Sequence, residues 1–260
     1  MKRNPLLVPA IGTVLVLFAA PQLILLLGTG GESWLRLFDP LYATIFWRSV
    51  WMALGTTVMT LLVGFPAAWA LARAVPERSR PALLLLVTLP LWTSVLVKLY
   101  AWVFLLRSGG LLSRLVMALG FESPELLYTT TAVAIGQLYV ELPYMILPIY
   151  AALERLDGSL VDAAQDLGAS PWTTLRRVVI PLTAPGIVAG CVLVFVPALG
   201  SVLVPDLLGG AKTAWVGTLI TSQFSTARDP ALGSAMAFAL SLITLGAFLF
   251  FGRFIAKAQE

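Results

Sequence analysis

The chain has 260 residues, of which 59% are hydrophobic and only 12% charged, with a net charge of +4. A soluble domain carries about 25% charged residues, so this chain has too little polar surface for a globule in water. Its mean hydropathy of +0.92 indicates a lipid environment instead. The basic balance then indicates cationic loops at a membrane surface rather than nucleic-acid binding. The absence of histidine and the single cysteine, Cys191, exclude disulfides within the chain and histidine-based metal chemistry, and no metal site is expected.

Six apolar segments are long enough to cross a bilayer, because a hydrocarbon core about 30 Å thick needs roughly 20 apolar residues per helix. We expect spans at about 5–27, 42–72, 81–106, 130–153, 178–203 and 231–255. The first apolar run is longer than the core of a cleaved signal peptide, so a retained span is expected. The sequence therefore predicts an all-α membrane protein that forms a single transmembrane domain over residues 1–260.

The distribution of Lys and Arg predicts the orientation. More of them fall on the side of the N-terminus than on the other side, most clearly Arg73, Arg78 and Arg80 in one short loop. The positive-inside rule then places both chain ends in the cytoplasm.

Prolines and small residues within the spans predict kinks and close helix packing. Pro66, Pro90, Pro143, Pro148, Pro185 and Pro197 each lack a backbone N–H that a straight helix would use. The runs 64–68 and 186–190 are rich in Gly and Ala and offer small faces for helix contact.

The segment 156–177 joins the fourth and fifth spans on the expected cytoplasmic side. Ser159 is a favourable N-cap for a helix through Leu167, and Gly168 stands where glycine commonly ends a helix. A second helix is expected to start near Pro171. One apolar stripe follows the first helix at helical spacing, made of Leu160, Ala163, Ala164 and Leu167. Such a stripe in the cytosol predicts docking into a partner's groove, with a helix lying on the membrane as the alternative.

This loop resembles the signature of the permease subunits of type I ABC importers, which is Glu-Ala-Ala, three residues, Gly, nine residues and Ile-x-Leu-Pro. Here Asp162-Ala163-Ala164 is followed by Gly168 and by Val178-Val179-Ile180-Pro181, with every spacing kept. Asp replaces the leading Glu, and two aliphatic residues are exchanged. The resemblance implies a coupling helix from Asp162 to Gly168 that docks on an ATPase subunit. The implied coupling residues are Asp162, Ala163, Ala164, Leu167, Gly168 and Pro181.

The segments 90–102, 142–150 and 205–210 look like those of the spermidine/putrescine permeases. That branch implies a polyamine substrate, with amino-acid-like solutes, phosphonates or other organic cations as alternatives. It also implies a bacterial inner-membrane complex with an ATPase dimer, a second homologous permease or a second copy of this chain, and a periplasmic solute-binding protein. No cofactor is expected in this chain, because ATP and Mg²⁺ would be bound by the ATPase subunits.

The chain is not expected to be an enzyme. A nucleotide-binding loop needs Gly directly before its Lys, and the nearest string, residues 209–213, lacks it. An ion-coupled transporter, the main rival, would need several carboxylates inside the spans, and only Glu141 qualifies. An intramembrane enzyme would need a catalytic constellation, which the sequence does not contain.

Two charged residues, Lys98 and Glu141, fall inside expected spans, where a charge usually faces a cavity or a counter-charge. One expectation is that they pair with each other or that Lys98 reaches a membrane interface. The other is that they line the translocation path. A carboxylate among aromatic rings would attract a cationic amine through ion pairing and cation–π contacts. The candidate path residues are Glu141, Lys98, Tyr100, Trp102 and Tyr144, with Tyr139 nearby.

Overall fold

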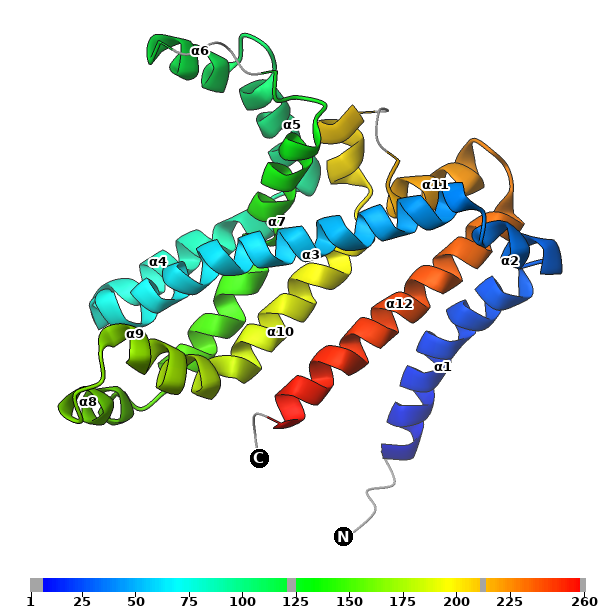
Figure 1. Ribbon diagram of the computed structural model, residues 1–260. Helices are drawn as coiled ribbons and strands as arrows, with labels where there is room; N and C mark the ends of the chain where they lie inside the picture. The colour runs from blue at the N-terminus through cyan, green and yellow to red at the C-terminus, as the bar shows by residue number, and fades with distance from the viewer. Residues whose placement is uncertain (1–6, 121–124, 211–213, 258–260) are drawn as a thin grey trace.

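The computed structural model describes residues 7–120, 125–210 and 214–257, and within these ranges the chain is helical with no strand. The predicted all-α class is therefore confirmed. The expected domain over 1–260 and the expected first span from residue 5 extend beyond the described residues at their ends. Figure 1 shows long, tilted helices joined by shorter helices at both ends of the bundle.

Five helical segments are long and apolar enough to cross a membrane: Pro40–Ala74, Val95–Ala118, Thr130–Glu154, Pro171–Leu199 and Pro230–Arg253. The first apolar run adds a sixth when its bent pair is counted as one span. There, α1 (Leu7–Leu27) is followed by α2 (Gly31–Leu37), and the two are bent by 94°. The described residues thus contain five candidate spans, or six when the bent pair is counted as one.

Four spans match their predicted positions closely. The second is α3 (Pro40–Trp69), which continues into the π-helical turn η1 (Ala70–Ala74). The fourth is α7 (Thr130–Glu154), and the sixth is α12 (Pro230–Lys257). The fifth is α10 (Ile180–Leu199), which ends before the predicted residue 203 because Gly200 takes the C-cap position.

The third expected span, 81–106, is not one continuous helix, so that prediction was wrong. It consists of α4 (Arg80–Thr88), the 3-10 turn η3 (Leu89–Trp92) and α5 (Val95–Leu106). Thr93 and Ser94 between them have extended backbone, with ψ of 149° and 134°. Pro90 disfavours helical continuation because its ring removes a backbone donor and crowds the preceding turn.

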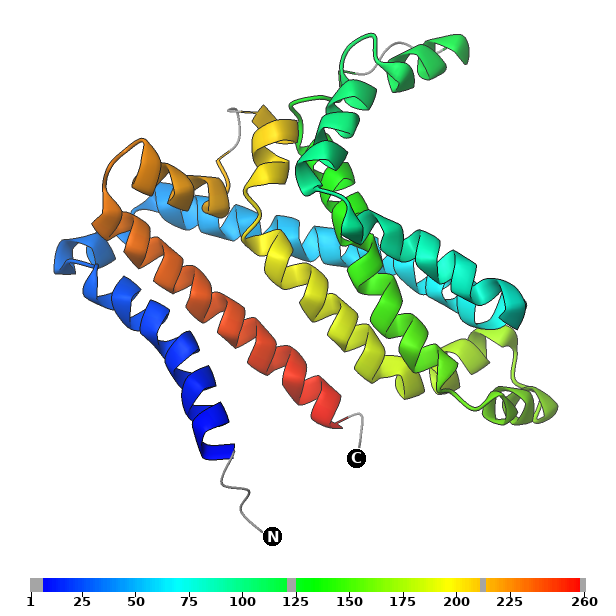
Figure 2. The same ribbon diagram turned by 180° about the vertical axis from the view of Figure 1, so that it is seen from behind.

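Several short helices outside the predicted spans were not predicted. They are η2 (Glu77–Ser79), α6 (Leu111–Ala118), η5 (Pro205–Gly209) and α11 (Val216–Ser225). One of them, α6, belongs to the candidate span Val95–Ala118. Figure 2 shows α11 and η5 at the end of the bundle opposite α8 (Gly158–Asp166). The bundle therefore has two ends with different short helices.

The centre of the fold is the packing of α3, α7 and α10 against one another. Met145 of α7 is fully buried between glycines of the two other helices. A Cβ placed on Gly64 would lie 2.9 Å from its Cγ, and one on Gly190 would lie 2.8 Å from its Sδ. A Cβ on Gly186 would lie 2.5 Å from that of Ala152. Both small faces predicted from the sequence therefore serve close helix approach.

A buried amide joins the same three helices by hydrogen bonds. Gln137 of α7 is 2% exposed, and its Oε1 accepts a hydrogen bond from Thr56 Oγ1 of α3 at 2.8 Å. Its Nε2 donates to the carbonyl of Ala198 in α10 at 3.2 Å. Polar groups at membrane depth need such partners, so this pair of bonds fixes the relative rotation of the helices.

The helices α1 and α12 lie together at the side of this core, and α12 also packs on α10 (Figures 1 and 2). The start of α1 and the end of α12 lie at the same end of the bundle as α8. This arrangement follows from an even number of crossings.

Candidate functional site

The helix α8 occupies the loop between the fourth and fifth spans, as predicted. Its N-cap is Asp157, whose carboxylate accepts a hydrogen bond from the Ser159 amide at 3.0 Å. The prediction that Ser159 is the N-cap was therefore wrong by two residues. The Ser159 amide holds the pKa of the Asp157 carboxyl below its usual range. A negative charge here favours the helix, because its amides and dipole are positive at this end.

The end of α8 is a sharp turn at Gly168, which has a φ of +81°. The Gly168 amide donates to the Gln165 carbonyl at 2.8 Å, and the Ala169 amide donates to that of Ala164 at 3.0 Å. These bonds satisfy carbonyls that the helix end leaves free, in the manner of a Schellman motif. Glycine suits the position because this left-handed conformation penalises residues with a Cβ. The predicted glycine stop is confirmed.

The next helix, α9 (Pro171–Thr174), begins where the sequence predicted a helix start. Ser170 is its N-cap, and its hydroxyl accepts a hydrogen bond from the Thr173 amide at 3.3 Å. The chain then passes through the π-helical turn η4 (Leu175–Val179) into α10. Pro181 lies exposed in the first turn of α10, directly after this π-helical turn.

Most of the predicted apolar stripe on α8 faces away from the protein. Leu167 is 89% exposed, Leu160 is 47% exposed and Ala163 is also exposed, whereas Ala164 is half-buried. Val161 instead packs against the core cluster around α7. Asp162 is exposed beside the stripe. One side of α8 is thus seated on the protein, and the other presents apolar side chains that the chain itself does not cover.

Arg73 ties this helix to the core, a role the sequence did not indicate. Its Nη2 donates to the carbonyl of Leu156 at 2.7 Å, and its Nη1 lies 3.3 Å from where a Cβ on Gly158 would be. Arg73 belongs to η1 at the end of α3, so the start of α8 is connected to the second span. In the sequence, the place of Arg73 in an arginine-rich loop indicated only the orientation of the chain in the membrane.

The candidate path residues lie on α5 and α7 but do not form one cluster. Lys98 and Glu141 are buried, with 9% and 6% of their surface exposed. Tyr100 and Tyr144 are exposed at 53% and 40%. Trp102 is half-buried and contacts Tyr139 edge to face, with ring centroids 5.6 Å apart.

Lys98 and Glu141 do not pair with each other in this structure, although both are described. Lys98 Nζ instead donates a hydrogen bond of 2.7 Å to the carbonyl of Pro90, across the break between α4 and α5. The Oε2 atom of Glu141 is buried and has no hydrogen-bond partner among the described residues. The lysine is therefore satisfied by the backbone, and the carboxyl group is left with an open acceptor.

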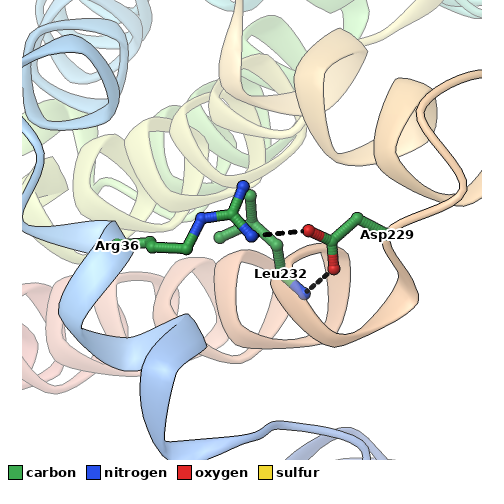
Figure 3. Close-up of polar contacts among 3 residues, drawn as sticks. All are labelled: Arg36, Asp229 and Leu232. Atoms are coloured by element: carbon green, nitrogen blue, oxygen red, sulfur yellow. Dashed lines mark hydrogen bonds and ion pairs between the residues drawn. The ribbon is translucent and has the colours of Figure 1, made fainter.

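The opposite end of the bundle carries an ion pair that the sequence did not indicate. Arg36 Nη1 of α2 lies 2.7 Å from Asp229 Oδ2, just before α12 (Figure 3). Asp229 Oδ1 accepts from the Leu232 amide at 3.1 Å and so caps α12. The Leu232 amide and then the Arg36 guanidinium hold the pKa of Asp229 below its usual range. The pair holds the bent α1–α2 unit against the start of the last span.

These features define a multi-span membrane protein with a short exposed helix tied to its central spans. A family model described as "Binding-protein-dependent transport system inner membrane component" matches residues 62–259. The chain is 43% identical over 214 residues to the spermidine/putrescine transport system permease protein PotB of Salmonella typhimurium, covering 82% of this chain and 74% of PotB. It is 31% identical to the molybdenum transport system permease protein ModB of Mycobacterium bovis, covering 84% and 81%.

Among solved structures, a bacterial ABC transporter involved in the import of the acidic polysaccharide alginate matches with a TM-score of 0.72. The match covers 98% of this chain and 95% of that one at 20% identity, so it shows the fold. The chain belongs to the family of binding-protein-dependent transport system inner-membrane components, the permease subunits of ABC importers. It is accordingly a multi-pass protein of the inner membrane, and the resemblance read from its loop is confirmed.

Proposed function

We propose that this permease forms part of the translocation path of an importer for polyamines such as spermidine or putrescine. The observation that carries the proposal is the 43% identity over 82% of the chain to permeases named for these two solutes. The identity to the molybdenum permease ModB is lower, at 31%. A cationic substrate also suits a path that contains a buried carboxyl group, Glu141, on the same helix as Tyr139 and Tyr144.

The proposed docking element for an ATPase subunit is α8. Its exposed stripe of Leu160, Ala163 and Leu167 offers apolar surface to a groove on the partner, and Asp162 lies beside it. The glycine turn at Gly168 sets the direction of the chain after the helix. In this proposal two ATPase subunits bind ATP and Mg²⁺, and the permease chain binds neither.

The rest of the complex is proposed to follow the family pattern. A second homologous permease or a second copy of this chain would complete the path, and a periplasmic binding protein would deliver the solute at the end of the bundle opposite α8. Both chain ends would then be cytoplasmic, on the side of α8. The arginine-rich loop at the same end of the bundle supports this orientation.

The proposed mechanism is a two-state switch. Binding of the loaded binding protein and closure of the ATPase dimer on ATP move α8. Because Arg73 joins the start of α8 to the end of α3, and α7 leads directly into α8, that movement is transmitted to two of the three central spans. The spans open outward to receive the solute, and hydrolysis resets the inward-facing state. Glu141, Lys98, Tyr100, Trp102 and Tyr144 are the proposed path residues.

The proposal is tested by reconstituting the complete complex in liposomes and measuring ATP hydrolysis with binding protein loaded with different solutes. Spermidine or putrescine is expected to stimulate hydrolysis and to accumulate inside. Stimulation by an anionic solute alone, such as molybdate, would overturn the polyamine assignment. Purification of the tagged permease is expected to retain an ATPase subunit, and its loss in a Leu167→Asp variant with normal expression would support docking through α8. Retention in that variant would count against it.

A further inference from the structure

The break in the third span is held by a charged side chain. The carbonyl of Pro90, in the first half of η3, accepts three hydrogen bonds: from the Thr93 amide at 3.4 Å, from Thr93 Oγ1 at 3.0 Å and from Lys98 Nζ at 2.7 Å. The shortest of these comes from the lysine, which lies one turn into α5. Lys98 is only 9% exposed, and its ammonium group donates to a neutral acceptor. A neutral carbonyl is a weaker partner for a cation than a carboxylate is.

A carboxyl group that would be that stronger partner lies nearby with an open oxygen. Glu141 Oε2 has no hydrogen-bond partner among the described residues, and the side chain is 6% exposed. The helices that carry the two residues, α5 and α7, pack against each other, although Lys98 and Glu141 form no direct ion pair. A buried carboxylate without a partner is costly at membrane depth, so the site favours any cation that reaches it.

We propose that Lys98 is an internal competitor of the substrate for Glu141, alternating between the Pro90 carbonyl and the Glu141 carboxylate during the transport cycle. The inference rests on the proposed polyamine function. The chemistry of the side chain supports it, because lysine carries a primary ammonium on a chain of four carbons, the same group that ends putrescine. One carboxylate cannot pair fully with both cations in a buried site.

In the structure described here Glu141 is buried and Lys98 does not pair with it, so the carboxyl group is available to a substrate once the path opens. Lys98 is held at the break between α4 and α5, and Tyr144, which follows Glu141 by about one helical turn, is exposed beside it. When Lys98 moves to Glu141, it displaces the bound amine toward release and frees the Pro90 carbonyl. Movement of the lysine thereby couples release of the substrate to a change at the bend of the third span.

A double-mutant cycle in the reconstituted complex tests this competition, with putrescine uptake as the readout. Lys98→Met removes the competing cation, so the apparent KM is expected to fall about tenfold, and kcat is expected to fall because release slows. Glu141→Gln removes the acceptor and is expected to raise KM about tenfold. In the double variant, KM is expected to equal that of Glu141→Gln alone, because the lysine no longer has anything to compete for.

Three further variants separate competition from a merely structural role. Lys98→Gln keeps a donor for the Pro90 carbonyl without the charge and is expected to lower KM as Lys98→Met does. Lys98→Arg keeps a cation and is expected to leave KM near the wild-type value. Glu154→Gln, on the same helix but bonded to Tyr150, is the matched control and is expected to leave KM unchanged.

The outcomes distinguish this inference from the function on which it rests. Suppose that the wild-type complex transports putrescine, and that Lys98→Met leaves KM unchanged and lowers kcat by the same factor in the wild-type and the Glu141→Gln backgrounds. Lys98 then only closes the helix break, and the competition is refuted. If the wild-type complex takes up no polyamine but does transport another solute, the proposed substrate fails first, and the competition fails with it.

Discussion

The turn that ends α8 allows a sharp test, because only the backbone conformation of Gly168 restricts what residue can stand there. Its φ is +81°, and a Cβ built on it would meet no atom within 4 Å. Any loss on substitution therefore comes from the left-handed conformation rather than from a clash. That conformation costs an ordinary residue about 1–2 kcal/mol, and asparagine adopts it more readily than most.

We therefore expect substrate-stimulated ATP hydrolysis to follow the order glycine, asparagine, alanine, valine at this position. If the docked shape of α8 requires the turn, a penalty of about 1–2 kcal/mol lowers the population of competent complex about 5- to 30-fold at most. Asparagine and valine are similar in size but differ in their tolerance of positive φ, so they form a matched pair. Hydrolysis is measured in the reconstituted complex at equal permease content. Equal losses for asparagine and valine would refute the argument, because size or mere substitution would then be the cause.

Three other predictions follow from the structure. Asp157→Ala is expected to lower stimulated hydrolysis more than Ser159→Ala, because Asp157 caps α8 through its side chain; equal effects of the two would contradict the cap assignment. Gly186→Val is expected to lower the thermal unfolding midpoint in detergent, whereas Gly246→Val, with no atom within 4 Å of its Cβ, serves as the control and is expected to leave it unchanged. Because the folded-state pKa of Asp229 is lowered, its contribution to stability is complete above an ordinary aspartate pKa of about 3.9 and is lost as the pH falls through the folded value. The unfolding midpoint of an Asp229→Asn variant should accordingly differ less from the wild-type midpoint at the acid end of a pH series.

The spans were predictable because the bilayer imposes a minimum length on every apolar helix. The ends of α7 and α12 lie within two residues of their predicted positions. The course of the third span was not predictable in the same way. Pro90 breaks that span, whereas Pro143 and Pro148 lie inside the continuous helix α7. A proline lacks the backbone N–H that would bond to a carbonyl of the preceding turn. Only the surrounding folded structure determines which group bonds to that carbonyl instead.

The loop that contains α8 was likewise predictable from the sequence only in part. The spacing from Asp162 to Gly168 indicated a helix and its glycine stop, and both are present. The N-cap was misplaced because Asp157 and Ser159 are both favourable N-cap residues. The bond from Arg73 to the Leu156 carbonyl, which fixes the chain just before the cap, joins residues 83 positions apart. No local pattern contains that information.

The sequence by itself determined the membrane environment, the loop motif from Asp162 to Pro181 and the family, because each of these depends on composition or on spacing within a short segment. Tertiary structure alone decided the partners of Lys98 and Arg36. Lys98 bonds to the Pro90 carbonyl rather than to Glu141, and Arg36 bonds to Asp229 from the far end of the chain. The physical reason is that a charge in or near a membrane is satisfied by whichever polar atom the packed helices bring within about 3 Å, and that atom is set by the packing rather than by nearness in sequence.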